Sequence, residues 1–176
     1  MLDKVQALAR EAGFTEWGLI PVEGLLFEEE IRRICEGNGC RNYGKSWACP
    51  PAVGTLQACR ERCAQYEHML LVSCRYAIED SFDFEGMAEA GKQFKQLTER
   101  FDAMLRGETE RFLLLSNEGC RRCVQCTYPD APCRYPRKLH HALEGYGFNV
   151  SQLAKTAGMR YMGGPDTVTY FGAVLL

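Results

Sequence analysis

The sequence predicts an α/β or α+β fold in which helices cover a mixed sheet of three or four strands and two cysteine-rich loops leave the sheet. Segments with helical periodicity alternate along the 176 residues with short apolar runs typical of strands. The composition, with 46% apolar and 25% charged residues, provides enough apolar material for one core in a chain of this length. We therefore expect residues 1–176 to form a single domain.

The first half of the chain alternates helix patterns with strand patterns. Apolar residues recur at three- and four-residue spacing over 2–12, and Gly13 follows at the position that glycine prefers after a helix. Between 37 and 55 the chain is rich in glycine and contains Pro50-Pro51, which predicts a loop. The elements expected here are a helix at 2–12, a strand at 17–22, a helix at 25–35, the loop at 37–55, a helix at 55–65 and a strand at 69–78.

The second half contains the most regular helix pattern, between 85 and 106. Its apolar stripe includes Ala90, Phe94 and Phe101, with Lys, Glu and Gln on the opposite side. The elements expected in this half are a helix at 85–106, a strand at 112–116, a cysteine-rich loop at 118–136, helices at 137–145 and 149–157, and a strand at 167–176.

Charge and hydropathy argue against several classes of function. The 21 Lys and Arg and 23 Asp and Glu give a net charge of −2, which offers no general attraction to nucleic acid or anionic lipid. The longest apolar runs are far shorter than a membrane span, and the first residues mix charges into a helical pattern unlike a signal peptide. We expect a cytoplasmic protein that binds neither membranes nor nucleic acid.

Ten cysteines are unusual for such a chain, because cytoplasmic thiols are kept reduced and seldom form structural disulfides. Four of them follow the pattern C-x2-C-x2-C-x6-C. Three thiolates at three-residue spacing wrap one object, which favours a [4Fe-4S] cluster over the two separated pairs typical of zinc sites. Zinc remains the alternative, and the fourth cysteine could instead ligate a second cluster. The four residues are Cys120, Cys123, Cys126 and Cys133.

Basic residues surround this second cysteine stretch. Between 121 and 138 only Asp130 is acidic, whereas five residues are basic. The positive charge would compensate a cluster with four thiolate ligands, or it could dock an acidic partner. The basic residues are Arg121, Arg122, Arg134, Arg137 and Lys138.

A second candidate centre has the spacing C-x4-C-x8-C and comprises Cys35, Cys40 and Cys49. Glycines in this stretch allow the backbone to approach a bulky group. The local sequence supplies no fourth ligand, which leaves open Cys59, Cys63, a crossover from Cys133, or water or a substrate. An open position would permit enzymatic chemistry, with Lys45, Arg41 or Tyr43 as polar groups around it.

The other cysteines and the histidines have simpler interpretations. Cys59 and Cys63 share one face of a predicted helix, where burial and ligation are both reasonable. Cys74 lies in an apolar strand and is expected in the core. His68 lies at a strand edge, and His140-His141 are expected on a helix in a surface or capping role.

The two stretches CEGNGCRNYGKSWACPP and GCRRCVQCTYPDAPCRYP, with the closing TYFGAVLL, resemble the predicted metal-binding proteins of domain of unknown function 2284. The resemblance runs from about residue 35 to the end and comes from a family found mainly in anaerobic bacteria and archaea. It implies metal binding without naming a reaction. Cys59, Cys63 and Cys74 lie outside the family pattern. The matching residues are Cys35, Cys40, Cys49, Cys120, Cys123, Cys126 and Cys133.

From these features we predict an iron–sulfur protein with one or two [4Fe-4S] clusters that acts in electron transfer or as an accessory redox protein in anaerobic metabolism. Its partner would be an unidentified redox protein. Two alternatives are kept: an enzyme with an open-site cluster, and a non-catalytic zinc module that recruits another protein.

Overall fold

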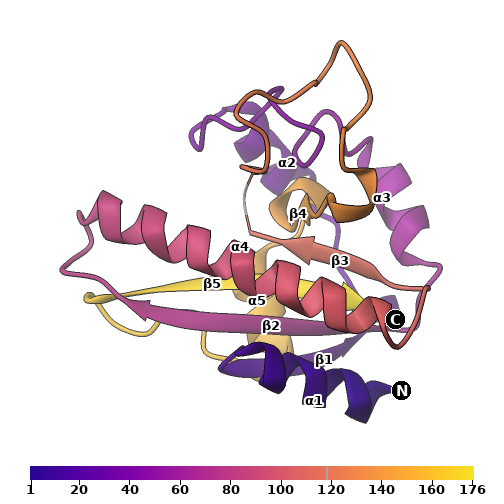
Figure 1. Cartoon of the computed structure of the whole chain (residues 1–176), viewed down its shortest axis with the longest axis vertical. Helices are drawn as coiled ribbons and strands as arrows, with labels where there is room; N and C mark the ends of the chain where they lie inside the picture. Colours follow the sequence, from indigo (N-terminus) through magenta and orange to yellow (C-terminus); the bar gives the residue numbers. More distant parts are fainter. Residues whose placement is uncertain (118) are drawn as a thin grey trace.

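Within residues 1–117 and 119–176, the part described by the computed structural model, five strands and five α-helices form an α+β fold around one mixed sheet (Figure 1). The helices are α1 (Leu2–Ala12), α2 (Glu29–Glu36), α3 (Leu56–Cys63), α4 (Phe84–Arg106) and α5 (Val150–Thr156). The strands are β1 (Glu16–Pro21), β2 (His68–Ala77), β3 (Leu113–Ser116), β4 (His141–Ala142) and β5 (Thr167–Leu175). Short 3-10 turns are η1 (Val22–Gly24), η2 (Pro136–Lys138) and η3 (Glu144–Tyr146).

The sheet has the strand order β1-β2-β5-β3-β4. All neighbouring strands are antiparallel except β3 and β4, which run parallel. In the register of the central strands, Val174 of β5 lies between Leu70 of β2 and Leu114 of β3. The strand β5 is therefore the centre of the sheet, although it follows all the other strands in the sequence.

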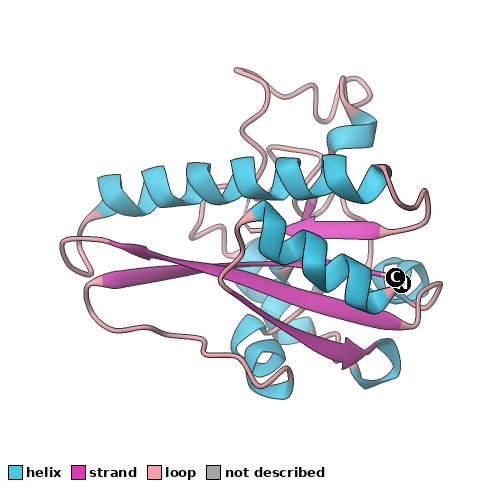
Figure 2. Ribbon diagram, turned by 60° about the horizontal axis from the view of Figure 1, so that its bottom comes forward, coloured by secondary structure: helices cyan, strands magenta, loops and turns pink. Residues whose placement is uncertain are grey.

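Helices α1 and α4 cover one face of the sheet (Figure 2). Alternate residues of β2, including Leu70 and Val72, point into this layer, as the two-residue period of a strand requires. The ring of Phe14 packs edge-on against Phe94 at 5.7 Å and against Phe101 at 5.4 Å between ring centroids. These contacts bury the apolar stripe of α4 and leave its opposite side exposed. No helix of the described residues is long and apolar enough to cross a membrane.

The other face of the sheet carries the second core, formed with α3, α5 and η3. The remaining residues of β2, Met69 and Leu71, point into it and meet Tyr146 and Phe148, all with exposed fractions of 0%. Both cysteine-rich segments lie beyond this core, beside β4, where they cross each other (Figure 1). The fold thus brings the two segments together at one end of the sheet.

Most expected elements are confirmed within a few residues. The helix at 2–12 is α1, and Gly13 ends it with a φ of 114°. The segment 37–55 has no helix or strand. The loop expected at 118–136 has neither over residues 119–135, and its first residue, Glu118, lies outside the described part of the chain.

Two expectations were wrong and have one cause. The segment 137–145 is not a helix, because it contains η2, β4 and the start of η3. His141 and Ala142 pair in parallel with Leu115 and Ser116, so the sheet has five strands and not three or four. The amide of Ala142 also donates to the carbonyl of Ala48 at 2.9 Å. Tertiary pairing therefore overrides the helical pattern of this segment.

Candidate metal-binding sites

The first cysteine set lines one cavity of about 170 Å³, which we call the three-cysteine cavity. Cys35 comes from the last turn of α2, whereas Cys40 and Cys49 come from the loop that follows. Tyr43 and Glu144 also line this cavity. The structure therefore brings together the three cysteines that the sequence grouped, although they span a glycine-rich stretch with no regular structure.

Helix α2 is fixed beside this cavity by a buried arginine. The guanidinium of Arg32 donates to the carbonyl of Gly145 at 2.9 Å and also to the carbonyl of Gly54. The Cys35 thiol, one turn further along the helix, lies 3.8 Å from the carbonyl oxygen of Glu144. These bonds connect α2 to η3 and to the segment before α3, so they determine where Cys35 enters the cavity.

The surroundings of the three-cysteine cavity disfavour the thiolate form of two of its cysteines, Cys35 and Cys49. Burial raises the pKa of Cys35 to about 11, and the nearby Glu144, Cys40 and Cys49 add to the rise, against the opposing charge of Arg32. Burial also raises the pKa of Cys49. A metal ligand must be a thiolate, so a metal that binds here has to displace protons from these groups.

The structure distinguishes between the residues considered as a fourth ligand for the first cysteine set. Cys59 and Cys63 have exposed fractions of 0% and belong to the core under the sheet, and neither lines the three-cysteine cavity. Cys133 lines a different cavity with the other cysteines of its own stretch. Glu144 lines the three-cysteine cavity and its charge acts on Cys35, and the sequence reasoning missed this neighbour. Its only signal in the sequence is a glutamate shortly after the second cysteine stretch, a weak signal by itself.

The second cysteine set lines a narrow cavity of about 20 Å³, which we call the four-cysteine cavity. All four cysteines are partly exposed, and Trp47 from the first cysteine segment forms part of the wall. Because the enclosed space is little larger than one water molecule, a cluster would have to be held at the open side of this loop. The cysteines are Cys120, Cys123, Cys126 and Cys133.

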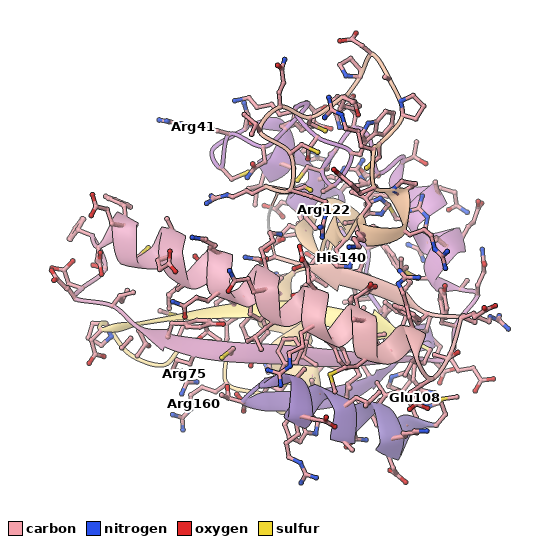
Figure 3. All side chains as sticks on the ribbon, in the orientation of Figure 1. Arg41, Arg75, Glu108, Arg122, His140 and Arg160 are labelled. Carbon is pink, nitrogen blue, oxygen red and sulfur yellow. The ribbon has the colours of Figure 1, made fainter. Side chains whose placement is uncertain are left out.

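The second loop is fastened to α4 and to itself. Lys95 of α4 donates to the carbonyls of Asn117 and Gly119, both at 2.8 Å, at the start of the loop. Arg122 forms an ion pair with Glu99 of α4 at 2.5 Å, and Figure 3 shows Arg122 between the loop and this helix. Further along, Arg134 donates to Gln125 O at 2.8 Å and Thr127 to Pro132 O at 2.9 Å.

The two cysteine segments contact each other directly. The Cys49 sulfur accepts a hydrogen bond from the backbone N–H of Gly119, the residue before Cys120. Gly119 has a φ of 69°, and a Cβ there would lie 2.9 Å from the side chain of Asn42, so a larger residue would be strained and would displace Asn42. The indole of Trp47 also donates to Ala131 O at 3.2 Å. The two candidate centres are therefore neighbours.

The thiols do not converge on a single point. In the described residues no group of three or more His, Cys, Asp and Glu side chains is placed to hold one metal ion. A tetrahedral zinc site would require four sulfurs about 2.3 Å from one centre. The donor sets, three and four thiols that line two cavities, are soft ligands and differ from the oxygen ligands that hard cations prefer.

The remaining cysteine and the two adjacent histidines make contacts typical of residues that stabilise the fold. Cys74 is buried at 7% exposure, as expected for a core residue. His141 belongs to β4, where its Nδ1 lies 2.9 Å from the Tyr146 hydroxyl. His140 lies 3.4 Å from the Asp102 carboxylate. Neither histidine is on a helix, which corrects that expectation. Arg41 is exposed and points away from the fold (Figure 3).

An α+β fold with two neighbouring clusters of reduced thiols defines a cysteine-rich protein equipped to bind metal. The family comparison agrees with this class. The model of the DUF2284 family, described as predicted metal-binding protein, matches residues 18–176, and the chain belongs to that family. The match begins further upstream than the resemblance at about residue 35 indicated. No curated protein and no solved structure shows significant similarity to the chain.

Proposed function

We propose that this protein binds iron–sulfur clusters at the two cysteine sets and transfers electrons to a partner protein. The observation that carries the proposal is the gathering of each set around its own cavity, with the two cysteine segments in contact through Cys49 and Gly119. Cysteine thiolates are the usual ligands of [4Fe-4S] clusters. A bound cluster would supply one-electron chemistry, and the protein would hold it and control its access to solvent.

The charges near the second set support a negatively charged cofactor there. Arg122, Arg134 and Lys138 line the four-cysteine cavity, and no acidic residue lines it in the described part of the chain. Positive side chains stabilise a cluster whose four thiolates make it anionic, and they raise its reduction potential. The fixed position of Arg122, paired with Glu99, keeps this charge beside Cys120 and Cys123.

The test is anaerobic purification followed by determination of iron, sulfide and zinc. We expect a brown protein with about four or eight irons per chain, matching sulfide, and an EPR signal after reduction. Cys123→Ser should remove the signal of the second centre, whereas the matched variant Cys74→Ser, in the sheet core, should leave the iron content unchanged. A colourless protein loaded with zinc would reject the iron–sulfur proposal and favour the zinc module.

A second candidate function is an enzyme whose first cluster keeps a position open for substrate. It is favoured by the three-cysteine cavity, where about 170 Å³ and only three cysteines leave room for another ligand among the described residues. Glu144 lines the same cavity and would be the alternative ligand at that position. If small ligands change the EPR spectrum of the first centre in wild type and Glu144→Gln protein, the enzyme is supported; a spectrum insensitive to every ligand in both proteins would count against it.

A further inference from the structure

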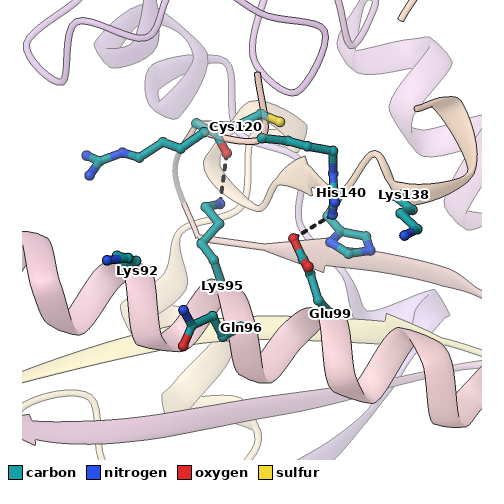
Figure 4. Close-up of a pocket in the computed structure, with 10 residues that line it drawn as sticks. Lys92, Lys95, Gln96, Glu99, Cys120, Lys138 and His140 are labelled. Atoms are coloured by element: carbon teal, nitrogen blue, oxygen red, sulfur yellow. Dashed lines mark hydrogen bonds and ion pairs between the residues drawn. The ribbon is translucent and has the colours of Figure 1, made fainter. Parts of the chain in front are cut away.

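A separate pocket of about 160 Å³ lies between α4 and the start of the second cysteine loop (Figure 4). We call it the basic pocket. Lys92 and Lys138 stand at opposite sides of it in the figure, with Lys95 and Glu99 between them. It is lined by Lys92, Lys95, Gln96, Glu99, Gly119, Cys120, Arg121, Arg122, Lys138 and His140.

The side chains that line the basic pocket carry mostly positive charge. Five of the lining side chains are cationic, and Glu99 is the single carboxylate among the described lining residues, in a chain whose net charge is −2. Glu99 is already paired with Arg122. Lys92 forms a long ion pair with Glu89, with 3.7 Å between its nitrogen and the carboxylate oxygen. Arg121 and Lys138 form no ion pair with any carboxylate that the structure describes. Like charges gathered this closely repel one another unless an anion lies between them.

The positions of these cations are set by the fold. Lys92, Lys95, Gln96 and Glu99 recur at the spacing of one helix face, on the side of α4 away from the buried stripe. The hydrogen bonds from Lys95 to Asn117 O and Gly119 O hold the loop over this face. The wall formed by residues 119–122 therefore has a fixed place opposite the helix.

We propose that the basic pocket binds a small oxyanion, the carboxylate or phosphate group of a small molecule. The size supports a small ligand, because about 160 Å³ is below the range of about 300–1,000 Å³ typical of pockets for drug-sized molecules. The pocket includes Cys120, so the bound anion lies next to the second cysteine set. Anion binding itself requires no metal, so the proposal is tested on the protein both without a cluster and after iron and sulfide are reconstituted.

Titration calorimetry with inorganic phosphate and with succinate tests this site on the full chain, with sodium chloride of equal ionic strength as the reference. The informative variant is Lys92→Gln/Arg121→Gln, because both side chains are exposed and neither lines the four-cysteine cavity. Arg160→Gln, on a surface away from the pocket (Figure 3), is the matched control. We expect saturable binding of at least one probe, weakened about tenfold in the double variant and unchanged in the control.

Three outcomes would overturn the proposal. Absence of saturable binding for both probes is the first, and binding that the double variant leaves intact is the second, since it places the site elsewhere. The third is loss of binding when iron and sulfide are reconstituted into the protein, which would show that these cations only balance the charge of the cluster. Iron content is measured on the same samples, so failure of the anion site and failure of the cluster are told apart.

Discussion

The buried carboxylate of Asp102 predicts a large and pH-dependent loss of stability in Asp102→Asn. Asp102 is 6% exposed and accepts two hydrogen bonds from Arg106, at 2.8 and 3.0 Å, while His140 lies at 3.4 Å. Arg106 also donates to Arg137 O at 2.6 Å. The carboxylate therefore connects α4 to the segment that closes the second cysteine loop.

The magnitude follows from these bonds. A hydrogen bond to a charged group contributes about 1.5–3 kcal/mol, and the side chain of Arg106 is 38% exposed, so solvent screening reduces the sum. We expect Asp102→Asn to lower the free energy of unfolding by about 2–3 kcal/mol at pH 7. Glu89→Gln, which removes an exposed ion pair of the same helix, is the control and should cost less than about 0.5 kcal/mol.

The pH dependence has a definite sign. Burial opposes ionisation of Asp102, but hydrogen bonds and charges from His140 and Arg106 outweigh it and lower the pKa below the ordinary 3.8. The stabilisation is thus fully present above about pH 4 and is lost as the pH falls through the lowered pKa. Urea unfolding followed by circular dichroism at pH 7 and pH 3 should show the difference between wild type and Asp102→Asn shrinking at pH 3. Equal differences at both pH values, or less than about 0.5 kcal/mol at pH 7, would refute the reasoning.

Three further predictions follow from other contacts. Trp47→Ala removes the bond to Ala131 O, so hydrogen exchange in that loop should accelerate about tenfold or more while exchange in β2 stays unchanged. Phe94→Ala leaves a cavity between α4 and the sheet and should lower the unfolding free energy by about 3–5 kcal/mol in a urea titration, without changing the metal content. Burial, and then nearby positive charge, lowers the pKa of His141 from 6.5 to about 4, so stability should fall progressively from about pH 6.5 to pH 4, and an NMR titration should show His141 neutral above about pH 5.

The helices of the fold were predictable because their signals are local. The apolar spacing over 2–12 and the glycine at 13 determine α1 and its end without reference to the rest of the chain. The stripe that contains Phe94 and Phe101 determines α4 in the same way. Each pattern buries one face of its own helix, so the sequence of that helix is sufficient to identify it.

The segment around β4 was not predictable because its apolar residues meet three different partners. Leu139 packs near Cys49, Ala142 pairs with Ser116 of β3, and Leu143 enters the core under the sheet. Their spacing resembles a helix face, but a helix would have presented them to one surface. A strand of two residues carries no sequence signal of its own, since its position depends on β3.

The cysteine sets were predictable from spacing, whereas the details of their surroundings were not. The contact between Gly119 and Cys49 and the approach of Glu144 to the first set join segments far apart in the sequence. The basic pocket likewise combines residues of α4 with residues of the loop. Nothing in the sequence around Lys92 therefore indicated that this residue lines a pocket. Spacing predicted which cysteines line the same cavity, and only the folded chain shows what lies beside them.

The central place of β5 has a consequence for how the protein is made. Its neighbours β2 and β3 have no edge in common, so the sheet cannot close before the ribosome has released Thr167–Leu175. Both cysteine segments leave the ribosome earlier, and their thiols are then part of an incompletely folded chain. The cysteines are therefore exposed to oxidation during synthesis, before the sheet that positions them is complete.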